Sequence, residues 1–289
     1  MAHATIDRPG ADGERGPAMA VVGFGPLAVF LAGTFALTWL TLLPLGPARY
    51  VLGYFAAQPT VVAFAVVGLY YGRRGVARLW RAGTRWRVGW AWYAIAVFLP
   101  GLAAGAGWLA TSSVGSAAPT RAPVITAVVG ALLAGIFEEF GWSGVAFPAL
   151  QSRWGFLRAG VVLGVIWALW HVPSLFTPAP LPRAHFSFVP FLLFTIPLRI
   201  LLGWVYNGTG GSVLLPALFH ASVNAWGNIV LGGNVVANTG HLVQILVFAA
   251  AVVIVIWRGQ ASAHRPRDRD AHRRAPSPHP TGGDPQSSR

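Results

Sequence analysis

The chain has 289 residues, of which 55% are hydrophobic and only 10% charged, and its mean hydropathy is +0.57. This composition is typical of a multi-pass integral membrane protein, because several apolar runs are long enough to cross about 30 Å of hydrocarbon. The chain contains no cysteine, which excludes disulfides and thiolate chemistry. We therefore expect an all-α bundle of transmembrane helices.

In chain order, a polar tail, an apolar middle and a second polar tail follow one another. Residues 1–19 and 259–289 are rich in Pro, Gly, Ser, Arg and Asp, and we expect them to be disordered tails without a catalytic role. Residues 20–258 are predicted to form one transmembrane domain. Windows of about 20 residues predict about eight helices in it. They cover residues 21–45, 50–71, 89–110, 123–150, 159–176, 186–206, 212–231 and 241–257.

All 21 basic residues are arginine, and the net charge is +13. Six of them lie in the predicted loop 72–88, which the positive-inside rule places in the cytoplasm. The predicted outer loops carry only Arg49, Arg121 and Arg183, so both termini are predicted to be cytoplasmic. We expect the positive charge to set the orientation of the chain in the membrane and to bind anionic lipid, with about 1 kcal/mol per Arg near the surface. No nucleic-acid partner is predicted.

The predicted helix 123–150 contains Glu138 and Glu139, the only acidic residues between positions 21 and 257. A carboxylate near the bilayer centre costs about 2.5 to 3.5 kcal/mol on insertion scales, so such residues usually mark functional sites. Successive helical side chains lie about 100° apart, so the two carboxylates point in different directions. The alternative is a neutralised acidic pair that only fixes helix contacts.

The next predicted helix, 159–176, contains His171. Gly160, Gly164 and Ala168 recur every four residues and predict a face on which another helix approaches closely. His171 follows on much the same side and is predicted to point into the bundle. A purely structural histidine is the alternative interpretation.

The predicted helix 212–231 carries a polar stripe, because His220, Asn224 and Asn228 follow one another at intervals of four residues. Interhelical hydrogen bonding alone would account for such a stripe in a membrane protein. However, the acids, the histidines and the asparagines of three predicted helices each need a buried partner, and they can supply one another. This indicates a shared site.

These motifs resemble those of the CPBP intramembrane proteases, a family that includes the type II CAAX prenyl endopeptidases and bacterial relatives linked to bacteriocin processing or immunity. The resemblance covers roughly residues 123–231. It is carried by Glu138-Glu139 with Gly141-Trp142, by the run from Trp167 to Pro173, and by Thr209-Gly210-Gly211-Ser212 leading to His220 and Asn224. The resemblance implies an endopeptidase of the bacterial plasma membrane that cleaves a membrane-associated protein or peptide.

The resemblance also implies roles for individual residues. Glu138 would act as general base on a water that His171 helps to hold, and Glu139 would be the supporting acid. His220 and Asn224 would donate hydrogen bonds to the oxyanion formed when the peptide carbonyl is attacked. Two further residues are predicted to support the site, namely Trp142 and Asn228.

The chain departs from the family pattern at one position. The family has an Arg four residues after the second Glu, where it would compensate the charge of that acid, and this chain has Ser143 there. Arg199 is the sole basic residue inside a predicted helix. We expect it to reach the acidic pair from helix 186–206, and the alternative is that it extends to a membrane interface.

Other mechanisms stay open at this stage. Residues 141–144 spell the Gly-x-Ser-Gly of rhomboid serine proteases, which would make Ser143 a nucleophile, although the order of the motifs differs from that family. Glu138, His171 and His220 could bind zinc, but no His-Glu-x-x-His helix is present, and we favour a mechanism without a cofactor. A transporter would use the same buried acids and histidines as a relay, and an immunity role without catalysis also stays open.

Overall fold

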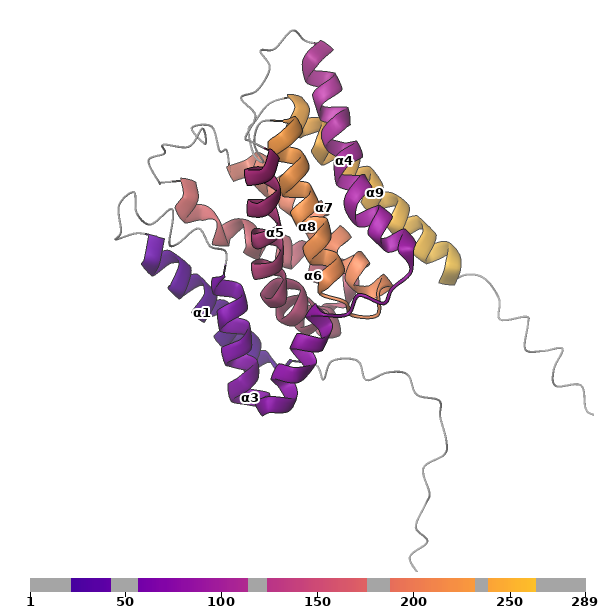
Figure 1. The fold of residues 1–289 in the computed structure, drawn as a ribbon. Helices are drawn as coiled ribbons and strands as arrows, with labels where there is room; N and C mark the ends of the chain where they lie inside the picture. The colour runs from indigo at the N-terminus through magenta and orange to yellow at the C-terminus, as the bar shows by residue number, and fades with distance from the viewer. Residues whose placement is uncertain (1–21, 43–56, 114–123, 176–187, 232–238, 264–289) are drawn as a thin grey trace, which may run out of the picture. The chain divides into compact units, whose positions relative to one another are not determined.

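The computed structural model of the chain describes residues 22–42, 57–113, 124–175, 188–231 and 239–263, and this part of the chain is helical throughout its regular structure (Figure 1). The predicted all-α fold is therefore confirmed for these residues. The predicted tails lie outside them, except that the last helix continues to Ala263. The chain divides into two compact units, Met1–Val252 and Val253–Arg289. The first unit holds the candidate site, and of the second the structure describes only the end of the last helix.

The helices of the described residues are long and mostly apolar. Without water in the hydrocarbon, each backbone N–H and C=O must be satisfied within the chain, which favours helices. Their bounds are α1 Phe24–Leu42, α3 Gln58–Gly83, α4 Trp90–Ser113, α5 Val124–Gly141, α6 Phe147–Trp170, α7 Phe188–Gly208, α8 Leu214–Val230 and α9 Thr239–Ala263, with a π-helical turn at Trp142–Ala146 and a 3₁₀ turn at Val172–Leu175.

Four helical stretches of the described residues are long and apolar enough to cross a membrane, which fits an integral membrane protein. They are Trp90–Ser112, Val128–Trp170, Phe188–Gly208 and Thr239–Gly259. The predicted count of about eight is not confirmed, because the predicted helices 123–150 and 159–176 overlap a single stretch of 43 residues, Val128–Trp170, and the apolar helix at Phe24–Leu40 is shorter.

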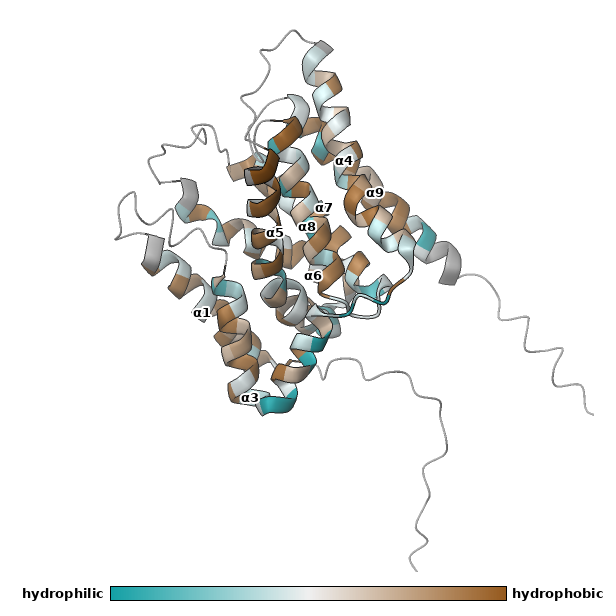
Figure 2. Cartoon of the chain, in the orientation of Figure 1, coloured by the Kyte–Doolittle hydropathy of each residue, from teal (hydrophilic) through white to brown (hydrophobic). Residues whose placement is uncertain are grey.

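The segment predicted as the loop 72–88 is helical as far as Gly83. Gly72 interrupts α3 with φ of 60°, a conformation that glycine adopts without steric strain, and a second helical half follows it. In this half Gly75, Leu79 and Ala82 are buried, and most of the arginines are exposed. Figure 2 shows hydrophilic residues gathered at this bend. The hydropathy window missed the helix because its arginines lower the average, although one face is apolar.

The predicted helix 123–150 is divided in two, and the predicted break near residues 151–158 is largely helical. After α5, the N–H of Phe147 bonds to the C=O of Trp142, five residues back, which is the π-helical pattern. The Phe137 carbonyl accepts a hydrogen bond from the Thr60 hydroxyl of α3. α6 then starts at Phe147 and bends at Gly155, where φ is 75°.

Small residues set the spacing between the helices that carry the site. α5 packs against α8, and α6 packs against α7. A Cβ atom on Gly135 of α5 would lie 2.4 Å from the carbonyl oxygen of Ala217 on α8. On α6, a Cβ on Gly164 would lie 2.7 Å from Cα of Ile196. The close helix approach predicted from the small residues of α6 is therefore confirmed, and it brings the polar residues of α5 to α8 together.

Candidate active site

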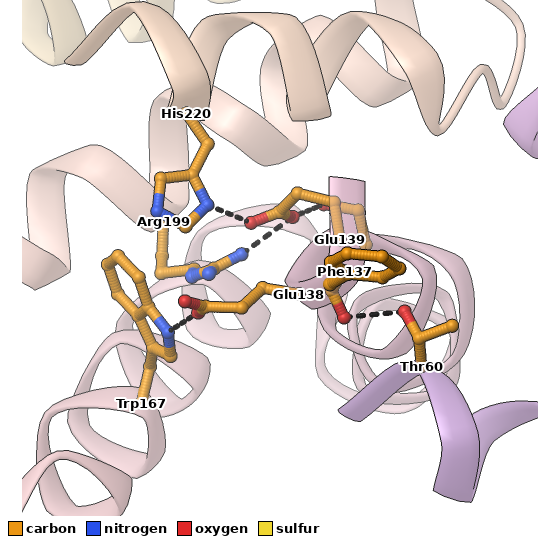
Figure 3. Close-up of polar contacts among 8 residues, drawn as sticks. Thr60, Phe137, Glu138, Glu139, Trp167, Arg199 and His220 are labelled. Atoms are coloured by element: carbon orange, nitrogen blue, oxygen red, sulfur yellow. Dashed lines mark hydrogen bonds and ion pairs between the residues drawn. The ribbon is translucent and has the colours of Figure 1, made fainter. Parts of the chain in front are cut away.

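The two acids lie at the C-terminal end of α5, immediately before the π-helical turn, and both are buried. As the helical geometry predicts, their carboxylates go to different neighbours (Figure 3). Oε2 of Glu138 accepts a 2.8 Å hydrogen bond from the indole Nε1 of Trp167 on α6. It is the one hydrogen bond to this carboxylate among the described residues.

Glu139 receives donors from three elements. Nη1 of Arg199 on α7 lies 2.9 Å from Oε2, and the Ser143 hydroxyl of the π-helical turn donates to the same oxygen. Nδ1 of His220 on α8 lies 2.9 Å from Oε1. Both carboxylate oxygens are therefore engaged. The expected contact between Arg199 and the acidic pair is confirmed, and the alternative interface position is wrong, because Arg199 is only 1% exposed.

Ser143 is 2% exposed, and its hydroxyl donates to Glu139. A serine nucleophile needs a neighbouring base, usually histidine, to take its proton. Among the described residues no hydrogen bond joins Ser143 to a histidine. Its position four residues after Glu139 instead makes it a hydrogen-bond donor to the Glu139 carboxylate.

His171 caps the C-terminal end of α6, and its Nδ1 lies 2.8 Å from the backbone carbonyl oxygen of Trp167. A carbonyl only accepts hydrogen bonds, so the proton of the neutral ring is assigned to Nδ1 and the lone pair to Nε2. The ring also packs edge to face against Trp167 and Phe191, with centroids 5.1 and 5.0 Å apart. His171 is therefore held in one orientation with an acceptor nitrogen.

Trp167 contacts more of the candidate residues than the sequence indicated. Besides its bonds to Glu138 and His171, its ring lies 4.0 Å from the guanidinium carbon of Arg199 and meets His220 edge to face at 5.2 Å. In the sequence, Trp167 stands out only as part of the motif from Trp167 to Pro173. The available signal was that a buried indole N–H requires an acceptor.

The other predicted residues lie on the expected elements. Asn224 and Asn228 follow His220 along α8, and both are half-buried. Trp142 is completely buried in the π-helical turn, where its ring packs edge to face against Phe30 and Trp170. Its indole N–H has no hydrogen-bond partner in the described part of the chain. Trp142 therefore contributes packing against α1 and α6.

A metal site requires several ligands close together. In the described ranges, no group of three or more His, Cys, Asp or Glu side chains is placed to hold a metal ion. Glu138, His171 and His220, the residues considered for zinc, do not form such a group. Glu139 already pairs with Arg199.

Two comparisons with known proteins point to one family. Residues 120–226 match the family model described as type II CAAX prenyl endopeptidase Rce1-like. The chain is also similar to CAAX prenyl protease 2 of Methanococcus maripaludis, with 35% identity over 98 residues, which are 32% of this chain and 36% of that protein. The match thus spans about a third of the relative's length. Over residues 120–226, the predicted resemblance to the type II CAAX prenyl endopeptidases is confirmed.

Proposed function

We propose that the chain is an intramembrane endopeptidase that hydrolyses a peptide bond of a membrane-associated substrate with water activated by Glu138. The difference between the two adjacent carboxylates carries this proposal. Glu139 is engaged at both oxygens by Arg199, Ser143 and His220, whereas Glu138 accepts one hydrogen bond at Oε2. Oε1 of Glu138 is then the oxygen that takes a proton. The match to the CAAX endopeptidase family supports the proposal that the chain is an endopeptidase.

In the proposed step, one water is consumed and one amide bond is broken. Glu138 takes a proton from the water as the water oxygen bonds to the substrate carbonyl carbon. The lone pair on Nε2 of His171 accepts the second hydrogen of the water and so orients its oxygen. The C–N bond then breaks while the proton passes from Glu138 to the leaving nitrogen. The products are a carboxylic acid and an amine.

The oxyanion that forms in this step is stabilised by donors from α8. Nδ1 of His220 donates to Glu139. In the proposed step Nε2 of the same ring also donates, to the oxyanion, so the ring carries a proton on each nitrogen. The carboxylate of Glu139 stabilises that charged ring, and Arg199 and Ser143 keep this carboxylate in place. Asn224, one helical turn further, supplies an amide donor.

We propose that the reaction needs no metal ion. Glu138 supplies the base and His220 the oxyanion donor, so neither role is left for a Lewis acid. Activity that persists after dialysis against a chelator is expected. Activity that is lost with the chelator and restored by zinc would contradict this part of the proposal.

The substrate class follows from the relatives. The similar archaeal protein is named a CAAX prenyl protease, so we propose a prenylated C-terminal peptide as substrate. The lipid would anchor the peptide in the bilayer and bring its scissile bond to a buried site. A membrane-associated leader peptide is the competing substrate.

The test uses the full chain in liposomes with quenched peptides of both kinds. Wild type is compared with Glu138→Gln, which keeps the shape but removes the base, and with Ser143→Ala. Cleavage that disappears only in Glu138→Gln is the expected result. Loss only in Ser143→Ala would favour a serine mechanism. If wild type cleaves neither substrate but moves solutes across the membrane, the proposal is wrong and a transporter is indicated.

A further inference from the structure

One tryptophan of α6, Trp167, contacts the residues that have a role in the proposed hydrolysis. Trp167 is 3% exposed, and its partners come from α5, α7 and α8 as well as from its own helix. Figure 3 shows its indole nitrogen directed at the Glu138 carboxylate, with the Arg199 guanidinium on the near side of the same carboxylate. We propose that Trp167 is a positioning residue for the hydrolysis, an inference that rests on the function proposed above.

The indole N–H determines which oxygen of Glu138 is available. A carboxylate on a two-carbon side chain rotates freely unless a donor fixes it. The 2.8 Å bond from Trp167 engages Oε2, which leaves Oε1 to receive the proton of the water. Without this donor the carboxylate rotates, and the water no longer meets a fixed base. A small misplacement of this kind lowers catalysis much more than it lowers binding.

Two further parts of Trp167 act on the neighbouring groups. Its backbone carbonyl accepts from Nδ1 of His171 and so keeps the lone pair on Nε2. The face of its ring lies against the Arg199 guanidinium, a favourable cation–π arrangement. The guanidinium is thereby held with Nη1 on Glu139. One residue therefore orients the base, the water-holding histidine and the cation of the supporting acid.

Trp170 provides a matched control within the same helix. It is also buried, and its Nε1 also donates a 2.8 Å hydrogen bond, but the acceptor is the Thr38 hydroxyl of α1. Its ring lies against His171, as does that of Trp167, with centroids 4.6 and 5.1 Å apart. The two tryptophans differ in the acceptor of the N–H. Removing the N–H from each tryptophan in turn, and comparing the two variants, therefore measures the effect of the hydrogen bond to Glu138.

The experiment replaces each tryptophan in turn with 3-benzothienylalanine, which keeps the ring size and lacks the N–H, in the full chain reconstituted in liposomes. At position 167 we expect kcat to fall about tenfold or more with KM within twofold, while Tm falls no more than it does at position 170. At position 170 kcat stays within twofold. Equal changes of kcat at the two positions would overturn the role of Trp167 and leave the proposed function intact. Failure of the unsubstituted chain to cleave would overturn both.

A different observation, at the bend of α3, carries a second inference. A hollow of about 530 Å³ is lined there by Gly68, Gly72, Arg73, Val76, Ala77 and Trp80. Two of the lining residues are glycines, and a side chain added at either would occupy space in or beside the hollow. A Cβ on Gly68 would lie 3.6 Å from Cγ2 of Val76, and a Cβ on Gly72 would meet nothing within 4 Å. The lining is apolar apart from Arg73.

The surroundings of this hollow match a membrane interface. Residues 72–88 contain six arginines and no acid, and Trp80, Trp86 and Trp90 nearby are 58%, 61% and 81% exposed. Exposed tryptophans beside arginines are typical of the headgroup region. We infer that the hollow binds one anionic phospholipid, with an acyl chain along Val76 and Ala77 and the phosphate at Arg73. A single cation beside an apolar wall fits an amphiphile with a net negative charge.

The test counts lipids retained on the full chain by native mass spectrometry after release from nanodiscs of equal phosphatidylglycerol and phosphatidylcholine. Arg73→Gln is expected to lower retention of phosphatidylglycerol severalfold. Gly68→Leu fills the hollow without changing the charge and is expected to do the same. Arg87→Gln, in the same basic segment but outside the lining, is the control. Equal loss for Arg73→Gln and Arg87→Gln, or equal retention of the two lipids by wild type, would overturn the inference.

Discussion

At the scale of single residues, Glu139 explains how an acid is kept inside an apolar bundle. Its donors come from three places in the chain, namely Ser143, Arg199 and His220. A buried carboxylate is stable only when it is paired and its remaining lone pairs accept hydrogen bonds. Glu139 meets both conditions, whereas its neighbour Glu138 accepts a single hydrogen bond, from Trp167, among the described residues.

Removing the cation is expected to impair both folding and cleavage. Arg199→Leu leaves the Glu139 carboxylate buried without its cation, and breaking a buried pair typically costs about 3 to 5 kcal/mol. The double variant Arg199→Leu with Ser143→Arg is expected to recover much of both properties, because position 143 already reaches the same carboxylate oxygen. Thermal unfolding in detergent and peptide cleavage measure the two effects. A double variant no better than Arg199→Leu would show that the position of the cation is not exchangeable.

The oxyanion donors are expected to affect kcat. Removing one donor from such a site typically lowers kcat by about 10²- to 10³-fold. We expect losses of this order for His220→Ala and Asn224→Ala, with KM little changed. Ser222→Ala is the control on the same helix, because its hydroxyl donates to the backbone of Leu218. Equal kcat values for Asn224→Ala and Ser222→Ala would remove Asn224 from the mechanism.

The polar residues of the site could be predicted from the sequence, and the role of Trp167 could not. Glu138, Glu139 and Arg199 stand out because a charge in an apolar helix needs a buried partner. Trp167 is one of 13 tryptophans, and an aromatic side chain in such a helix is usually explained by packing. Its acceptor lies on another helix, 29 residues earlier in the chain, and only the tertiary structure identifies it.

At the scale of helices, glycine decides which pairs approach closely, and α5 offers a direct comparison. Gly135→Ala places a Cβ 2.4 Å from the backbone oxygen of Ala217 and is expected to destabilise the protein by about 1 to 3 kcal/mol. Gly130→Ala on the same helix meets nothing within 4 Å. It is expected to be neutral or to stabilise by up to about 1 kcal/mol through helix propensity. The difference in Tm between the two variants measures the effect, and equal Tm values would mean that α5 moves freely against α8.

Helix positions followed from hydropathy, whereas bends did not. The predicted apolar runs correspond to α4, α7, α8 and α9 with small shifts of their ends. The bends at Gly72 and Gly155 depend on the backbone angles of two glycines among 35. The π-helical turn after Gly141 has no signature in composition, because it adds one residue to a turn without changing its polarity.

At the scale of the whole molecule, the arginine distribution predicts the orientation in the membrane. Thr84 and Ser112 lie near opposite ends of α4 and are both exposed. The chain has no native cysteine, so single cysteines can be labelled without interference. We expect an impermeant maleimide added to intact cells to label Ser112→Cys, and to label Thr84→Cys only after the cells are opened. The reverse pattern would contradict the cytoplasmic placement of the termini.

The ion pair between Glu139 and Arg199 also bears on how the protein is synthesised. Its partners are 60 residues apart in the chain. At about 5 to 20 residues per second, α7 leaves the ribosome roughly 3 to 12 s after the end of α5. During this interval the acid has no cation, so it either carries a proton or remains inside the insertion machinery. The pair therefore forms only when α7 docks against the earlier helices, and His220 of α8 joins the same carboxylate later still.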